Sequence, residues 1–189
     1  MRKTSKRVVL LLIGPSGSGK TSMGKRIAQN KGWGNISEDD IWNKIDHIPH
    51  TYRTPKEQAV IQPLSVKNIM KLVKKGKNVV FEFLVFDNPP IPIKWYQKAL
   101  SKKKVNVITR VFRPSVKELL KRQKIRGRKR EENVKHQRKH AIHQLKCLHS
   151  KMVKKSWVIN PKGTLEENYS KYFLPIILSS SHALVVDHL

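Results

Sequence analysis

The chain has 189 residues, of which 38% are hydrophobic, and this size suits one globular domain with a buried core. The 40 Lys and Arg residues against 13 Asp and Glu residues give a formal net charge of +27, which favours polyanionic partners such as ATP or nucleic acid without selecting one. A single cysteine, Cys147, excludes an internal disulfide and fits a cytoplasmic protein. No apolar run reaches the ~18 residues that a membrane span needs, so we expect no membrane partner.

Residues 8–21 (VVLLLIGPSGSGKT) predict a buried strand, a phosphate-binding loop and a helix over 22–30. The loop holds a complete G-x-x-x-x-G-K-[ST] signature, in which glycines let the backbone approach phosphate oxygens and the helix N-terminus faces the anion. We expect the nucleotide phosphates to contact Gly14, Pro15, Ser16, Gly17, Ser18, Gly19, Lys20 and Thr21. Lys20 brings a positive charge to the β- and γ-phosphates, and the Thr21 hydroxyl is placed to bind Mg²⁺.

Three consecutive acids, Glu38, Asp39 and Asp40, open a second predicted helix after a short strand candidate. Ser37 followed by Asp40 resembles a capping box, and carboxylates in a first turn favour the helix dipole. This structural role accounts for Asp40 and can account for Glu38. Asp39 remains available for chemistry, because the carboxyl end of a second strand faces the nucleotide in a doubly wound sheet.

Residues 78–86 (NVVFEFLVF) are apolar on both faces apart from Glu82, which predicts a central parallel strand. A buried carboxylate is costly unless it is paired or lies near a cation, so Glu82 is a candidate for the magnesium site. Asp87, just after this run, is an equal candidate, and the sequence does not choose between them. In the structural alternative, Glu82 pairs with a Lys or Arg and Asp87 caps a turn.

The rest of the chain predicts two more strands, at 105–112 and 157–159, and helices that begin near residues 54, 93, 115 and 164. Three of these helices begin with a predicted capping box: Thr54 with Glu57, Ser115 with Glu118, and Thr164 with Glu167. Between them, residues 121–138 concentrate Lys and Arg around Gly127. A helix that breaks there and restarts near Glu131 would form an arginine-rich lid, over about residues 126–138, that brings charge to a transferred phosphoryl group. The candidate catalytic arginines are Arg126, Arg128 and Arg130. The alternative is a solvated pair of basic helices.

Two further candidates for nucleotide contact are Arg122, which precedes the lid, and the turn backbone at Pro161.

The order of predicted strands, phosphate loop, helices and lid along the chain resembles that of the small P-loop kinases, which include shikimate and gluconate kinases, chloramphenicol phosphotransferase and polynucleotide 5'-hydroxyl kinases. The resemblance covers roughly residues 7–172. With the alternating strand and helix patterns, it implies a three-layer α/β fold with a parallel five-stranded sheet in the order 2-3-1-4-5, a kinase domain over 1–175 and a tail over 176–189.

Residues 32–40 (GWGNISEDD) look similar to a polynucleotide kinase stretch in which the first acid of an Asp-Asp pair takes the proton from the attacking hydroxyl. This resemblance implies that Asp39 is the catalytic base. Trp42 stands where that family has an Arg that binds substrate phosphate, so the acceptor stays open.

The sequence therefore predicts a kinase that uses ATP and Mg²⁺ to phosphorylate a hydroxyl group, on a small molecule or on a nucleotide or polynucleotide 5'-end. Two alternatives also remain open. One is a nucleic-acid-associated NTPase whose hydrolysis drives a switch, and the other is a nucleotide-binding protein without transfer activity.

Overall fold

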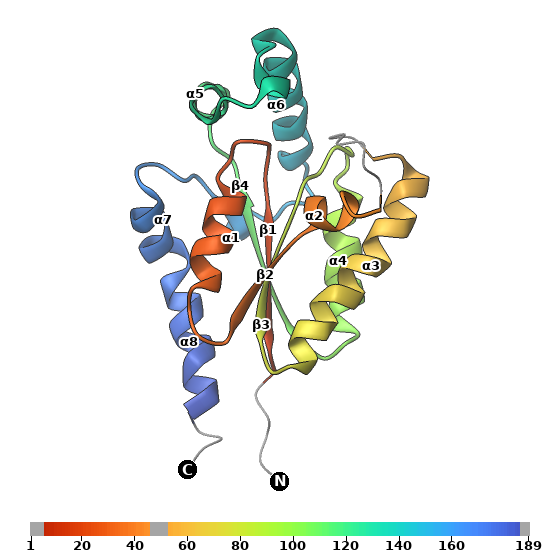
Figure 1. Cartoon of the computed structure of the whole chain (residues 1–189), viewed down its shortest axis with the longest axis vertical. Helices are drawn as coiled ribbons and strands as arrows, with labels where there is room; N and C mark the ends of the chain where they lie inside the picture. Colours follow the sequence, from red (N-terminus) through yellow and green to blue (C-terminus); the bar gives the residue numbers. More distant parts are fainter. Residues whose placement is uncertain (1–5, 46–52, 186–189) are drawn as a thin grey trace.

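The computed structural model describes residues 6–45 and 53–185, without the side chains of Arg130 and residues 181–185. It contains a five-stranded sheet with helices on both faces (Figure 1). The strands are β1 (Val8–Ile13), β2 (Trp33–Ser37), β3 (Asn78–Phe83), β4 (Asn106–Phe112) and β5 (Val158–Ile159). All neighbouring strands are parallel, and their order, β2-β3-β1-β4-β5, confirms the predicted sheet.

The helices form the two outer layers and a group above the carboxyl ends of the strands. They are α1 (Lys20–Ala28), α2 (Glu38–Trp42), α3 (Pro55–Lys74), α4 (Ile91–Ser101), α5 (Val116–Arg126), α6 (Val134–Leu148), α7 (Leu165–Tyr172) and α8 (Leu174–Val185), with 3-10 turns η1 (Lys129–Glu131) and η2 (Lys155–Trp157). In Figure 1, α1, α7 and α8 lie on one side of the sheet and α3 and α4 on the other, while α5 and α6 rise above it.

Strand β1 explains the layering, because all six of its side chains are buried. Side chains alternate between the two faces of a strand. Val9 and Leu11 accordingly join the cluster under α3 and α4, and Leu10 and Leu12 join the cluster under α1, α7 and α8. Each fully buried side chain of this size contributes about 1.5–3 kcal/mol of transfer free energy. The central strand is thereby fixed between two cores, and the loop that follows it has a rigid base.

Side-chain caps mark the starts of α3, α5, α6 and α7, and three of the four predicted capping boxes are confirmed. In each, a hydroxyl accepts from the backbone N–H of a Glu three residues later, and that Glu accepts from the cap backbone. The confirmed boxes are Thr54 with Glu57, Ser115 with Glu118, and Thr164 with Glu167. The box at Ser37 is wrong: α2 begins there, but the Ser37 side chain makes no capping hydrogen bond.

The C-terminal helix crosses the predicted border between residues 175 and 176. Phe173, Ile176 and Ile177 are all buried and belong to the same cluster as the apolar side chains of α1. The described part of the predicted tail therefore continues a packed helix. None of the helices within residues 6–45 and 53–185 combines the length and apolar character that crossing a membrane requires.

Candidate active site

The loop between β1 and α1 has the geometry of a tight anion cradle. Gly17 and Gly19 have φ values of 82° and 95°, which L side chains rarely adopt. A Cβ on Gly14 would lie 2.7 Å from the Ser18 Oγ and 2.8 Å from the Phe112 Cβ, so no larger residue fits there. The N-terminus of α1, where an anion is favoured, comes directly after Gly19.

Lys20 is the first residue of α1, and its side chain folds back over the loop. The ammonium Nζ donates to the Pro15 carbonyl oxygen at 3.0 Å. The side chain is largely buried, and this burial lowers the pKa of Lys20 from 10.5 to about 8, while the carboxylates of Glu82 and Asp39 oppose the shift. A bound phosphate would supply the negative charge that this buried cation needs.

Thr21 and Glu82 form a pair of oxygen donors next to Lys20. The Thr21 hydroxyl donates to Glu82 Oε2 at 2.7 Å. Burial raises the pKa of Glu82, and the Thr21 hydroxyl and the Lys20 ammonium oppose that shift. Hydroxyl and carboxylate oxygens are the ligands that Mg²⁺ prefers, so this donor set fits the predicted metal.

Asp87 occupies a different place from Glu82. Strand β3 ends at Phe83, and Asp87 lies four residues further on, near enough to His143 on α6 for their charges to interact. Partial burial raises the pKa of Asp87, and His143 opposes the shift. Asp87 does not line the cavity that contains Lys20 and Thr21. The structure therefore brings only one of the two predicted metal-binding acids to the phosphate loop.

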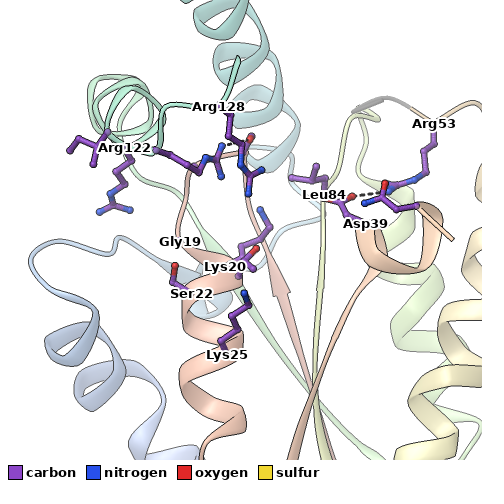
Figure 2. Close-up of a pocket in the computed structure, with 15 residues that line it drawn as sticks. Gly19, Lys20, Ser22, Lys25, Asp39, Arg53, Leu84, Arg122 and Arg128 are labelled. Carbon is purple, nitrogen blue, oxygen red and sulfur yellow. Dashed lines mark hydrogen bonds and ion pairs between the residues drawn. The ribbon is translucent and has the colours of Figure 1, made fainter. Parts of the chain in front are cut away.

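Asp39 faces the phosphate loop across a cavity of 520 Å³ that Lys20 and Thr21 also line (Figure 2). Its side chain is 52% exposed, and its Oδ1 accepts from Arg53 Nη2 at 2.7 Å. The cavity therefore has cations from the loop on one wall and a carboxylate on the other. A group bound beside Asp39 would lie within the same space as phosphates held by the loop.

Three residues behind Asp39 were not identified from the sequence as part of the site: Glu38, Arg53 and Tyr96. Glu38 is more than a first-turn acid, because its side chain is buried and accepts from Arg53 Nη1 at 2.9 Å and from the Tyr96 hydroxyl. Burial raises the pKa of Glu38 to about 7, and Arg53 and Tyr96 oppose the shift. These partners are 15 and 58 residues away in sequence, and no local pattern signals them.

The basic segment above the cavity is broken where the sequence predicts. Helix α5 ends at Arg126, and Gly127 follows in the left-handed region with a φ of 61°. The turn η1 comes next, and α6 restarts at Val134, three residues after the predicted Glu131. The break therefore gives two helices joined by a short connection above the loop, as Figure 1 shows.

Two of the three predicted lid arginines, Arg126 and Arg128, line the cavity. Figure 2 shows Arg128 above the phosphate loop. Arg126 Nη2 donates to the Ser16 Oγ at 3.2 Å, and its guanidinium also forms an ion pair with Glu131. The Arg130 side chain lies outside the described part of the structure. Arg126 and Arg128 thus line the same cavity as Lys20, while the catalytic role of all three arginines stays a prediction.

Arg122 connects the other side of the loop to the turn at Pro161. Its Nη1 donates to the Ser18 carbonyl oxygen at 3.2 Å and its Nη2 to the Pro161 carbonyl oxygen at 3.0 Å. A second cavity, of 210 Å³, lies beside this bridge and has Phe112 and Leu165 among its apolar lining residues. The structure therefore brings the two predicted nucleotide contacts together at a partly apolar site next to the loop.

Residues 9–147 match the model of a protein family described as an AAA domain, which is most of the chain. The chain belongs to this AAA domain family. No curated protein matches the sequence.

The fold of this AAA domain protein is similar to those of several solved structures. A tunicamycin resistance protein from Deinococcus radiodurans has a TM-score of 0.60 at 13% identity, over 89% of this chain and 97% of that one. A gluconokinase from Sinorhizobium meliloti 1021 has a TM-score of 0.59 at 17% identity, over 100% of both chains. A chain of the Pnkp1/Rnl/Hen1 RNA repair complex has a TM-score of 0.56 at 17% identity, over 85% of this chain but only 53% of that one. These likenesses confirm the predicted resemblance to small P-loop kinases at the level of the fold.

Proposed function

We propose that this AAA domain protein is a cytoplasmic, ATP-dependent kinase that transfers the γ-phosphoryl group of ATP to a hydroxyl group. The observation that carries the proposal is the shared cavity of 520 Å³, in which Lys20 and Asp39 lie on opposite walls. Phosphoryl transfer needs a cationic cradle for the donor and a group that accepts the proton of the attacking hydroxyl, with both in reach of one phosphorus atom. The position of Lys20 and Asp39 around one cavity supports this assignment.

On the donor side, the loop N–H groups and Lys20 hold the β- and γ-phosphates, and the cavity beside Arg122 and Pro161 receives the adenine. Thr21 and Glu82 hold Mg²⁺, which neutralises charge on the phosphate oxygens when it is bound. The fit of these groups is supported by the narrow glycine cradle, by the buried Lys20 ammonium and by the oxygen pair of Thr21 and Glu82.

On the acceptor side, Asp39 is the general base. Its Oδ1 is bonded to Arg53, so we assign Oδ2 to the acceptor hydroxyl. The hydroxyl proton passes to Asp39 as the hydroxyl oxygen forms a bond to the γ-phosphorus. The bond between that phosphorus and the β–γ bridging oxygen breaks, and ADP leaves with the electron pair. Charge that develops on the γ-phosphoryl oxygens is stabilised by Lys20 and by the lid arginines Arg126 and Arg128.

The contacts of Arg126 support a proposal that the basic segment closes as a lid over the bound nucleotide. Its guanidinium is paired with Glu131 and touches Ser16 of the phosphate loop, so a small rearrangement moves its charge from a carboxylate to a phosphate. Gly127, with its positive φ, is the point at which the chain can bend. Arg130 belongs to the same basic segment and is proposed as a third member of this set.

The proposal is tested by transfer of labelled γ-phosphate from ATP to a panel of hydroxyl compounds. The panel contains 5'-hydroxyl oligonucleotides, nucleosides, sugars and aminoglycoside-like alcohols, with Lys20→Met as the inactive control. We expect one acceptor class to be labelled, and the net charge of +27 favours acceptors that carry phosphates of their own. Acceptor-independent release of phosphate would instead support a hydrolysis-driven switch, and a blank result with ATP bound would reduce the function to nucleotide binding.

A further inference from the structure

Arg53 is a buried cation that binds two neighbouring acids at once. Its side chain is 2% exposed. Nη1 donates to Glu38 Oε2 at 2.9 Å and Nη2 donates to Asp39 Oδ1 at 2.7 Å, so the two arms of the guanidinium fork reach different carboxylates. Figure 2 shows Arg53 and Asp39 joined on the wall of the cavity opposite the loop. One residue thus connects the exposed Asp39 to an interior carboxylate.

The interior end of this connection is fixed by the core. Glu38 is 1% exposed, and its Oε1 accepts from the hydroxyl of Tyr96, which is 0% exposed. The Tyr96 ring lies with its centroid 4.9 Å from those of Phe81 and Phe83 on β3, and 5.2 Å from that of Trp95. Aromatic contacts of this kind restrict the ring to one orientation. The hydroxyl therefore gives Glu38, and through it Arg53, a rigid anchor.

We propose that Arg53 is a positioning residue that holds the Asp39 carboxylate toward the phosphate loop, and that Glu38 and Tyr96 hold Arg53 in turn. This Tyr96–Glu38–Arg53–Asp39 relay rests on the proposed function, because it explains how the general base of the kinase is oriented. Tyr96 acts from inside the core, since it is not among the residues that line the cavity.

The need for such a relay follows from the exposure of Asp39. A carboxylate that is 52% exposed on a five-residue helix has few packing contacts of its own to select one side-chain rotamer. The planar guanidinium fixes the angle between its two donor arms, so one charge-assisted hydrogen bond to each acid ties the position of the Asp39 carboxylate to that of Glu38. Lysine offers a point charge without this fork, so it cannot bind both acids with the same geometry. Misplacing a catalytic group by about 1 Å can lower a rate by about 100-fold.

The first test replaces Tyr96, because Tyr96→Phe removes one hydroxyl and leaves the ring packing in place. The control is Tyr169→Phe, which removes another buried tyrosine hydroxyl, bonded to Asn30 Oδ1 at 3.1 Å on the opposite face of the sheet. We expect Tyr96→Phe to lower kcat by about tenfold and to leave the KM for ATP unchanged, whereas Tyr169→Phe changes neither. If the Tyr96 hydroxyl had only a structural role, both variants would lose thermal stability, and Tyr96→Phe would not lower kcat at an unchanged KM.

The second test removes the Arg53 guanidinium by mutation and supplies free guanidinium ion in solution. Arg53→Ala should lose at least as much kcat as Tyr96→Phe, and added guanidinium ion at millimolar concentration should restore part of it, whereas an equal concentration of ammonium ion should not. Rescue by both ions alike, or by neither while the variant remains folded, would contradict the positioning role of Arg53.

The third readout needs no activity. Protons on a guanidinium held by two carboxylates exchange slowly, so the Arg53 Nη–H groups of the wild-type protein should give resolved NMR signals that broaden in Tyr96→Phe. If these signals are absent from the wild type, or if Tyr96→Phe leaves both them and kcat unchanged, the relay is wrong even if the kinase proposal stands. A wild type that labels no acceptor would remove the kinase proposal alone, because the NMR signals would still decide whether the relay exists.

Discussion

The two walls of the central cavity are built in different ways. The wall proposed to bind the phosphate donor, here called the donor wall, consists of consecutive residues, Gly14 to Thr21, in the loop after β1 and the first turn of α1. The acceptor wall consists of side chains that come together from distant segments, with Arg53 bonded to Glu38 and Asp39, and Tyr96 bonded to Glu38. One wall is therefore specified by local backbone conformation and the other by long-range ion pairs and hydrogen bonds.

The difference indicates which wall tolerates amino-acid changes, and so which wall can adapt to different acceptors. A backbone cradle recognises phosphate, which every nucleoside triphosphate shares, and it tolerates little change, since a Cβ on Gly14 would lie within 2.8 Å of two side chains. A wall of paired side chains can be changed one residue at a time. We therefore expect donor-side variants to affect ATP binding and acceptor-side variants to affect transfer.

Among the variants of the two walls, the largest effect on kcat and ATP binding is expected for Lys20→Met. This change removes the cation that lies over the loop, so we predict a loss in kcat of about 100- to 1,000-fold together with weaker ATP binding. Lys31→Met, which removes an exposed lysine just beyond α1, is the matched control and should change neither. The measurement is steady-state kinetics with calorimetric ATP binding. Wild-type ATP affinity in Lys20→Met would show that the loop is not the donor site.

A smaller effect, on ATP affinity, is expected when a rise in pH deprotonates Lys20. Because burial lowers the pKa of Lys20 to about 8, the free protein loses the Lys20 charge as pH rises above that value. Bound phosphates favour the protonated form, so ATP binding should take up a proton, and affinity should fall by about tenfold between pH 7 and pH 9.

The matched control for pH is Lys20→Arg, which keeps its charge throughout this range. Its ATP affinity should be lower overall but nearly constant with pH. A wild-type affinity that is also constant from pH 7 to pH 9 would show that Lys20 does not titrate in this window.

The smallest effect is expected at the edge of the donor wall, for Arg122→Ala. This change removes the bridge between the Ser18 and Pro161 carbonyl oxygens, and with it one side of the proposed adenine cavity. Because the Arg122 side chain is partly exposed, we predict only about a threefold to tenfold loss of ATP affinity, with kcat at saturating ATP unchanged. Lys121→Ala, at the exposed neighbouring position, serves as the control. Equal losses in the two variants would point to general charge rather than to the bridge.

The same contrast explains what could be predicted from the sequence. The phosphate loop, the break at Gly127 and three capping boxes follow from patterns within a few residues, and all are present in the structure. The sheet order, which the structure also has, was predicted from the resemblance to small P-loop kinases and from the alternation of strands and helices. The acceptor wall was predicted only at Asp39. The pairing of Glu38 with Arg53 and Tyr96 depends on how α2, α4 and the segment before α3 meet in space.

The two candidate acids for the proposed magnesium site show the same limit of prediction from sequence. Glu82 and Asp87 both follow or interrupt an apolar run, and the sequence could not choose between them. The choice depends on where β3 ends. Its last residue is Phe83, so Glu82 lies beside Thr21, while Asp87 is carried toward α6 and His143.

The most direct test of the central claim compares Asp39→Asn with Asp40→Asn for ADP release with and without an acceptor. Both variants remove one negative charge from adjacent positions on α2, but only Asp39 lines the cavity. We predict that Asp39→Asn loses acceptor-dependent ADP release by about 100-fold or more while its ATP affinity is retained, and that Asp40→Asn behaves as the wild type. Equal activity of the two variants, or ATP turnover that needs no acceptor and survives Asp39→Asn, would contradict the assignment of the two walls as donor and acceptor sites of a kinase.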